Sequence, residues 1–394
     1  MKIIIAPDSY KGSISAKEAA EAIEKGIRRC LPQAEIVKIP IADGGEGTLD
    51  CMIEAGGGVK IPVRVTGPLG EPVDAAYGLL NGGETAVIEL AAASGLTLVP
   101  EDQRNPLAAT TYGTGELIRA ALDYGCRHFI VGLGGSATND GGAGILQALG
   151  MRLLDHNGQE VAPGGGNLGR IAAIDDSGFD PRIRNSRFVI ASDVENPLVG
   201  PMGATRVFGP QKGATPGQVE LLEQNLVHWA DLIERATGCR LHEKSGAGAA
   251  GGTGGAFQAF FPAEFRRGID VVIEHSRLRE ALAGTDLVLT GEGKIDHQTV
   301  SGKAPMGIAQ EAQKYGVPVI ALAGSVGEGI DVLYKHGIHA VFSMVNGPMP
   351  LSAAMKDAAA LLEQAAEQIV RAFCAGRNPG CSLEGIRGRG TQDR

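Results

Sequence analysis

The chain has 394 residues, a formal net charge of −9 and a hydrophobic fraction of 43%. At roughly 100–200 residues per domain, this length predicts two or three domains with a sizeable core. The negative charge and an aromatic content of 4% argue against a nucleic-acid partner, and the lack of a long apolar run argues against a membrane span. The first apolar run is too short for a secretory signal, and the six cysteines form no CxxC pair, so we expect a cytoplasmic protein.

The two ends of the chain show an α/β rhythm. The N-terminal part predicts strands at 2–6 and 35–41, a helix at 15–29 and a second helix that ends near residue 58. Ser15 and Glu18 have the spacing of a capping box at the start of the first helix. The C-terminal part predicts strands at 287–293, 317–324 and 340–345 and helices at 303–315, 328–336 and 352–374. Because these strands are continuously apolar, they are typical of a parallel sheet covered on both faces.

The middle of the chain begins with a different pattern. Residues 59–90 predict three strands joined by turns, and the later part predicts helices at 113–124, 142–149 and 216–236 and strands at 128–133 and 187–192. We therefore expect an α/β fold of two domains. One is formed by residues 1–62 and 277–375 with a largely parallel, Rossmann- or flavodoxin-like sheet, and the other, also α/β, is inserted at 63–276. Residues 376–394 lack a periodic pattern and predict a disordered tail.

Several motifs directly follow predicted strands. Ligands of open parallel sheets bind beyond the carboxyl ends of the strands. We therefore expect the active site in the cleft between the two domains, where Asp8–Lys11, Asp43–Thr48 and Gly291–Asp296 would gather.

A glycine-rich loop at 132–142 (GLGGSATNDGG) lies between a strand and a helix. Its small residues expose successive backbone N–H groups, an arrangement that suits phosphate oxygens. An ordinary glycine-rich turn is the alternative. The candidate phosphate-binding residues of this loop are Gly134, Gly135, Ser136, Thr138, Asn139 and Asp140.

The other strand-end motifs carry charge. Lys11 and Lys294 are candidate cations for an anionic substrate, and Asp43 and Asp296 are candidate Mg²⁺ ligands. Asp193 follows a buried strand and could accept a hydroxyl proton as a general base. The structural alternatives are a solvated lysine for Lys11, a helix cap for Asp43 and an Asx turn for Asp193. Further candidate binding residues in these motifs are Asp8, Ser9, Gln211, Lys212, Gly291 and Gly293.

The chain lacks a P-loop motif, and its one GxGxxG, at 246–251, does not follow a buried strand, which argues against NAD binding. From the residues alone, the motifs indicate phosphate chemistry on a small anionic substrate without naming that substrate.

Together the motifs resemble those of the bacterial glycerate kinase family, the type without a P-loop. Seven segments occur in the family's order and approximate spacing, from Met1 to about Ala375: APDSYKGSISA, ADGGEGT, GLGGSATNDGG, ASDVENPL, FGPQKGAT, TGEGKIDHQT and PVIALAG. The resemblance implies a two-domain α/β fold and ATP- and Mg²⁺-dependent phosphorylation of D-glycerate, with 2-phosphoglycerate as the expected product. Asp193 matches the family's proposed catalytic aspartate.

Other readings stay open at this point. The product could be 3-phosphoglycerate, the substrate could be another small hydroxy acid, or the protein could bind a nucleotide without turnover. Arg64, Arg104 and Arg206 are candidates for contacting the substrate carboxylate, and the sequence does not rank them. The oligomeric state is also undetermined.

Overall fold

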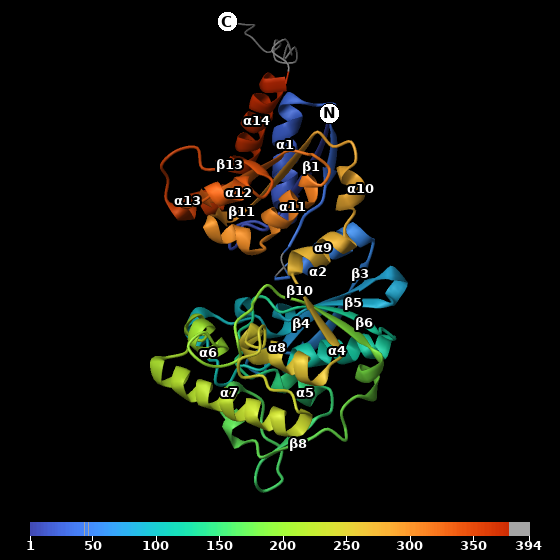
Figure 1. Cartoon of the computed structure of the whole chain (residues 1–394), viewed down its shortest axis with the longest axis vertical. Coiled ribbons are helices and arrows are strands. Elements are labelled where there is room, and N and C mark those ends of the chain that lie inside the picture. The colour runs from blue at the N-terminus through green and yellow to red at the C-terminus, as the bar shows by residue number, and fades with distance from the viewer. Residues whose placement is uncertain (43, 46, 378–394) are drawn as a thin grey trace, which may run out of the picture. The chain divides into compact units, whose positions relative to one another are not determined.

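The computed structural model describes residues 1–42, 44–45 and 47–377 (Figure 1). The chain divides into two compact units: a first unit of Met1–Ala42 and Ser276–Arg394, and a second unit of Asp43–His275. The α/β class expected from the sequence is confirmed, since each unit contains a sheet with helices. Within the described part of the chain, no helix is long and apolar enough to cross a membrane.

The first unit is built on a parallel sheet with the order β13-β12-β11-β1-β2. Its strands are β1 (Lys2–Pro7), β2 (Glu35–Lys38), β11 (Leu287–Ile295), β12 (Val319–Val326) and β13 (Ile338–Ser343). Its helices are α1 (Ala16–Cys30), α10 (Leu278–Leu282), α11 (Ala304–Gln313), α12 (Asp331–Tyr334), α13 (Leu351–Lys356) and α14 (Ala358–Arg377). Counted along this unit, the strand order is 2-1-3-4-5, which is the flavodoxin-like order.

Local sequence signals explain most of these elements. Ser15 Oγ accepts from the N–H of Glu18 at 3.2 Å and Glu18 Oε2 accepts from the N–H of Ser15 at 2.9 Å, so the predicted capping box is confirmed. The single helix predicted at 352–374 is two helices, because Asp357 leaves the helical conformation between α13 and α14. Aspartate favours helix ends over helix interiors. Helix α14 continues to Arg377, and the rest of the predicted tail lies outside the described residues.

The second unit is built on a mixed sheet with the order β10-β9-β6-β5-β4-β3. Its strands are β3 (Val59–Thr66), β4 (Pro72–Leu80), β5 (Thr85–Glu89), β6 (His128–Gly132), β9 (Arg187–Ala191) and β10 (Ala263–Arg266), with a separate ribbon of β7 (Arg152–Leu154) and β8 (Ala173–Asp175). Its helices are α2 (Thr48–Gly56), α3 (Ala91–Ser94), α4 (Tyr112–Tyr124), α5 (Ala143–Ala148), α6 (Ala204–Phe208), α7 (Pro216–Thr237), α8 (Ala249–Phe260) and α9 (Gly268–His275). Strands β5, β6, β9 and β10 are parallel, whereas β3 and β4 form the expected antiparallel meander with β5.

The first boundary between the units differs from the expected one. The sequence pattern placed residues up to 62 with the first domain, whereas the second unit begins at Asp43. The reason is strand pairing, because β3 pairs with β4 along its whole length and α2 packs against β4 and β5. The second boundary, at 275/276, lies one residue from the expected position.

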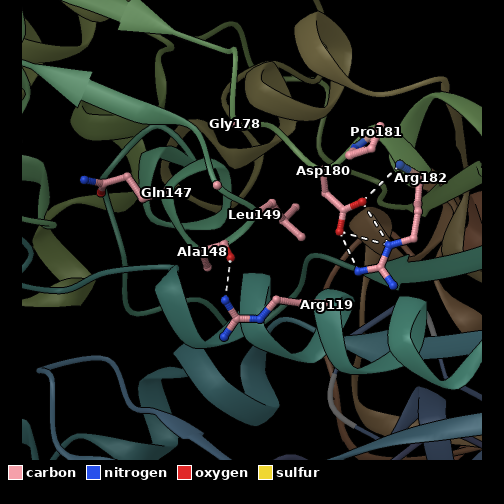
Figure 2. A pocket seen from close by; sticks show the side chains of 9 residues that line it. Arg119, Gln147, Ala148, Leu149, Gly178, Asp180, Pro181 and Arg182 are labelled. Atoms are coloured by element: carbon pink, nitrogen blue, oxygen red, sulfur yellow. Dashed lines mark hydrogen bonds and ion pairs between the residues drawn. The ribbon is translucent and has the colours of Figure 1, made fainter.

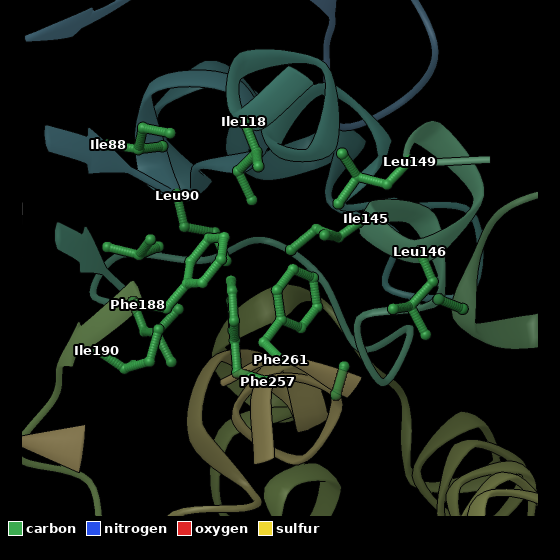
Figure 3. Packing of buried hydrophobic residues seen from close by; sticks show 14 of the residues in the cluster. Ile88, Leu90, Ile118, Ile145, Leu146, Leu149, Phe188, Ile190, Phe257 and Phe261 are labelled. Atoms are coloured by element: carbon green, nitrogen blue, oxygen red, sulfur yellow. The ribbon is translucent and has the colours of Figure 1, made fainter. Parts of the chain in front are cut away.

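Aromatic packing closes the core of the second unit. Phe129 and Phe188 stack with ring centroids 4.6 Å apart. The ring centroids of Phe188 and Phe261, both labelled in Figure 3, lie 5.0 Å apart in an edge-on arrangement. Trp229 of α7 is fully buried and donates its indole N–H to the carbonyl of Gly141 at 3.1 Å. This contact ties α7 to the glycine-rich loop that follows β6.

Glycines let three chain segments approach one another at the carboxyl ends of β6 and β9. A Cβ at Gly44 would lie 2.9 Å from the carbonyl oxygen of Ala191. A Cβ at Gly132 would lie 2.5 Å from the carbonyl oxygen of Gly44. A Cβ at Gly134 would lie 2.6 Å from the Cα of Gly45. Side chains are therefore excluded from this backbone packing.

Replacing Gly134 with alanine should disturb this packing. Because the added methyl group meets backbone atoms and not a flexible side chain, we expect a loss of about 1–3 kcal/mol in the free energy of unfolding, measured by urea denaturation. Gly217→Ala is the matched control, since a Cβ there has no neighbour within 4 Å and the residue lies in the first turn of α7. Equal stability of the two variants would contradict the close packing at Gly134.

Candidate functional site

Two of the strand-end motifs, Asp8–Lys11 and Gly291–Asp296, meet in the first unit, where β1 lies beside β11. The N–H of Asp8 donates to the carbonyl oxygen of Gly291 at 2.8 Å, and the hydroxyl of Tyr10 donates to the carbonyl oxygen of Leu322 at 2.9 Å. In a sheet of order 2-1-3-4-5, the neighbouring first and third strands form the switch point at which ligands bind. The structure therefore places Asp8–Lys11 and Gly291–Asp296 at the edge where the fold offers a ligand site.

The two glycines of the β11 motif serve local packing. A Cβ at Gly291 would lie 2.5 Å from the hydroxyl of Tyr10 and would collide with the Leu322 carbonyl, while Gly293 lies against the backbone of Tyr10 and Lys11. Burial is the main reason that the pKa of Tyr10 is raised, with smaller contributions from the negative charges of Glu292 and Asp8. Tyr10, which sequence reasoning did not single out, thus holds the loop after β1 against β11 and β12.

Lysine–carboxylate pairs organise the end of β11. Lys294 Nζ lies 3.0 Å from Asp296 Oδ2, and Lys303 Nζ lies 3.0 Å from Glu292 Oε2. Thr299 Oγ1 donates to Glu292 Oε1 at 2.9 Å. The side chain of Lys294 is 64% exposed, whereas that of Asp296 is 9% exposed. The edge therefore holds fixed carboxylates beside lysines that face solvent.

Asp296, a predicted magnesium ligand, has a carboxylate that its neighbours hold in place. Asp296 Oδ1 accepts from the N–H of Gln298 at 2.9 Å, which fixes the carboxylate as the cap of the turn at 297–301. The Lys294 ammonium group is the main reason that the pKa of Asp296 is lowered. An ionised carboxylate oxygen is a ligand that Mg²⁺ prefers, and its ion-pair partner Lys294 is exposed to solvent. The residue fits a magnesium site, while Asp43, the other predicted ligand, lies outside the described residues.

The glycine-rich motif forms the loop that follows β6, at the carboxyl end of that strand in the second unit. Gly135 is exposed at a φ of +73°, and its carbonyl accepts from the N–H of Leu96 at 2.8 Å. Thr138 and Asn139 are fully buried, and Asn139 Nδ2 donates to Thr205 Oγ1 at 3.0 Å. Thr138 Oγ1 and Asn139 Oδ1 have no hydrogen-bond partner in the described part of the chain. Buried polar atoms without partners are rare and often mark a site for a ligand or water.

Asp140, which the sequence predicts to contact phosphate, is fully buried. It accepts from the N–H of Thr111 at 2.8 Å, from Thr111 Oγ1 at 2.9 Å and from the N–H groups of Gly142 and Gly144. Burial raises the pKa of Asp140, and these donors act against that shift. A buried anion would also repel phosphate. Asp140 therefore holds the loop in place from inside the unit, and its contact with phosphate stays a prediction.

Lys212 reaches the same loop from the turn after α6. It is 2% exposed, and its Nζ donates to Ser136 Oγ at 2.8 Å and to the carbonyl oxygen of Thr138 at 2.7 Å. Burial lowers the pKa of Lys212 to about 7, and the negative charge of Asp140 partly opposes this shift. The lysine is therefore an internal support of the glycine-rich loop whose charge responds near neutral pH. Gln211, beside it, is exposed.

Asp193 lies immediately after β9, the neighbour of β6. Its Oδ1 accepts from the N–H of Gly268, the first residue of α9, at 3.2 Å. Asp193 also contributes to the raised pKa of Arg267, which Asp270 mainly determines. Strand β10 and helix α9, which position this contact, were not predicted from the sequence. Because β6 and β9 are parallel neighbours, Asp193 shares a sheet edge with the glycine-rich loop.

A shallow pocket of about 490 Å³ opens elsewhere on the second unit (Figure 2). It is lined by Arg119, Gln147, Ala148, Leu149, Gly150, Gly178, Asp180, Pro181 and Arg182. These residues come from α4, from the end of α5 and the turn after it, and from the segment before β9. Arg182 is paired with Asp180 and Asp123, and Arg119 donates to the carbonyl of Ala148 at 3.1 Å. None of the residues predicted for the site lines this pocket.

The pKa of Lys212 leads to a prediction of pH-dependent stability. Between about pH 7 and pH 10.5, the unfolded chain holds a proton on this lysine that the folded protein lacks, so the free energy of unfolding rises with pH in this window. As the pH rises through this window, the free energy of unfolding of the wild-type protein should therefore increase relative to that of Lys212→Met. The increase is at most about 1.4 kcal/mol per pH unit. Urea denaturation at about pH 7 and pH 9 measures this difference.

Lys25→Met, on the exposed side of α1, controls for the loss of one surface charge. A stability difference between wild type and Lys212→Met that stays constant across the window would show that Lys212 remains protonated.

Comparison with known proteins covers almost the whole chain. Residues 3–374 match the model of the glycerate kinase family. The chain is 55% identical to the glycerate kinase of Bacillus subtilis (strain 168), over 94% of this chain and 97% of the relative. It is 50% identical to the glycerate 2-kinase of Escherichia coli (strain K12), over 96% of this chain and 100% of the relative. A crystal structure described as that of a "putative glycerate kinase 2" from Salmonella typhimurium LT2 matches with a TM-score of 0.82 and 50% identity, over 96% of this chain and 99% of that chain. The protein with these two strand-edge clusters belongs to the glycerate kinase family.

Proposed function

We propose that this protein transfers the γ-phosphoryl group of ATP to the C2 hydroxyl of D-glycerate and releases 2-phospho-D-glycerate and ADP. The observation that carries the proposal is the 50% identity, over the full length of the relative, to a protein named glycerate 2-kinase. The charged groups at the carboxyl edges of both sheets support it, because phosphoryl transfer depends on positioning and charge neutralisation.

In this proposal, lysines of the first unit neutralise phosphate charge. Lys11 and Lys294 are exposed at the carboxyl edge of the β1 and β11 strands. Glu292 and Lys303 hold the β11 end in place through their ion pair. When bound through Asp296, a magnesium ion would supply further charge neutralisation for the ATP phosphates. Lys294, exposed beside this carboxylate, would contact a phosphate oxygen of the substrate.

Asp193 is the proposed general base. Its Oδ1 is oriented by the N–H of Gly268, and a donor at a helix start stabilises the negative charge of the carboxylate. The carboxylate accepts the proton of the C2 hydroxyl as that oxygen forms its bond to the γ-phosphorus. The bond between the γ-phosphorus and the bridging oxygen breaks, and the electron pair leaves with ADP.

Backbone groups of the glycine-rich loop complete the proposed binding site. Gly135 is exposed and carries no side chain, so its N–H group can approach a phosphate oxygen closely. The N–H of Gly134 donates to the carbonyl oxygen of Gly44 at 3.4 Å, so Gly134 serves the packing of the loop. Lys212 holds the loop through Ser136 and Thr138. Asp140, itself part of the loop, accepts from the N–H of Thr111 and so ties the loop to the start of α4. The loop is therefore supported from inside the unit before a ligand arrives.

Phosphorus-31 NMR on the purified protein with MgATP and D-glycerate tests the function directly. We expect ADP and one new phosphomonoester signal that matches 2-phosphoglycerate. A 3-phosphoglycerate signal would retain the kinase but move the attacking oxygen to C3 and so contradict the proposed pose. Bound ATP without any phosphoester would contradict the proposed activity and favour another hydroxy acid or a binding protein.

Substitution of the base separates chemistry from binding. Asp193→Asn removes the proton acceptor with little change in shape, so kcat should fall by roughly 10²- to 10⁴-fold while the dissociation constant for ATP stays unchanged. Asp74→Asn, on the exposed side of β4, removes a carboxylate from the same unit and is the control. Near-normal turnover of Asp193→Asn would exclude Asp193 as the base.

A further inference from the structure

Arg104 lies beside the turn that carries Lys212. It follows the short helical turn at 101–103, and its guanidinium Nη1 donates to the carbonyl oxygen of Gln211 at 3.5 Å. A Cβ at Gly213 would lie 2.5 Å from the carbonyl oxygen of Arg104, so the two backbones are in direct contact. Because Lys212 in turn contacts Ser136 and Thr138, Arg104 belongs to the structure around the glycine-rich loop.

The guanidinium of Arg104 has no anionic partner in the described part of the chain. Its Nε is buried and donates to no acceptor among the described residues. The one contact of its tip, to Gln211, is long for a hydrogen bond. A buried donor without an acceptor lowers the stability of the protein, more so when the group is charged. An arginine kept in this state is suited to an anion that arrives from outside the chain.

The other two arginines that the sequence left as candidates are placed differently. Arg206 makes two hydrogen bonds to the carboxylate of Glu220, at 2.8 and 3.0 Å. Arg64 lies on β3, the strand at the edge of the sheet, three positions away from β6 and opposite Asp74. The guanidinium of Arg206 is therefore already paired. Arg64 lies three strands away from β6, the strand that leads into the glycine-rich loop.

We propose that Arg104 recognises the carboxylate of the hydroxy-acid substrate. This inference rests on the proposed function, because it assigns the group that distinguishes an acid from a neutral polyol. The planar guanidinium matches a carboxylate with two parallel N–H donors, a geometry that an ammonium group lacks. Lys212 nearby already donates to two protein oxygens. We therefore assign the substrate carboxylate to Arg104 and not to Lys212.

The experiment compares the Michaelis constants of the two substrates in Arg104→Met and Arg104→Lys. Loss of a charge-assisted hydrogen-bond pair should raise KM for D-glycerate by roughly 10- to 100-fold in Arg104→Met, with KM for MgATP unchanged. Arg104→Lys keeps the charge but not the planar fork and should recover part of this loss. Isothermal titration of D-glycerate into each variant provides a readout that does not depend on turnover.

Arg64→Met is the matched control, because it removes an arginine from the same unit at an exposed strand position. Unchanged KM for D-glycerate in both Arg104 variants would overturn the inference, as would an increase confined to KM for MgATP, which would assign Arg104 to the nucleotide. If Arg104→Met fails to fold, Arg104→Lys decides between these outcomes. Failure of the proposed function is distinguished by the wild-type protein, which would then form no phosphoglycerate at all.

Discussion

The buried carboxylate of Asp140 is the group on which the site of the second unit depends. It accepts hydrogen bonds from Thr111, which begins α4, and from Gly142 and Gly144, which begin α5. The positive ends of two helix dipoles thus meet one anion, which makes the burial of its charge tolerable. These bonds fix the end of the glycine-rich loop between β6 and α5, and Lys212 holds the same loop at Ser136 and Thr138.

The two units hold the charged residues of the candidate site in different ways. In the first unit, lysines and carboxylates are already paired at the surface, and the exposed Lys294 can exchange its partner for a ligand at little cost. In the second unit, the charged groups Asp140 and Lys212 are buried and hold backbone in place. The first arrangement suits an electrostatic response to phosphate, and the second suits a rigid shape that selects a small substrate.

Elements with a local cause could be predicted from the sequence. Helix α1 follows from its capping box and its apolar stripe, and the meander of β3, β4 and β5 follows from the turns between its strands. The parallel sheet of the first unit followed from continuously apolar strands. By contrast, the boundary at Asp43, strand β10 and helix α9 depend on partners far along the chain, which local periodicity does not contain.

The sequence by itself determined the class of fold, the membership in a kinase family and the motifs that follow each strand, because these depend on residue types and short spacings. Only the tertiary structure decided what the side chains in those motifs do. It showed Asp140 as an internal anchor and Lys212 as a buried support, and it distinguished Arg104 from Arg206. Burial and partner choice arise from contacts between distant segments, so an aspartate that binds a loop from inside and one that faces a ligand have the same appearance in a sequence.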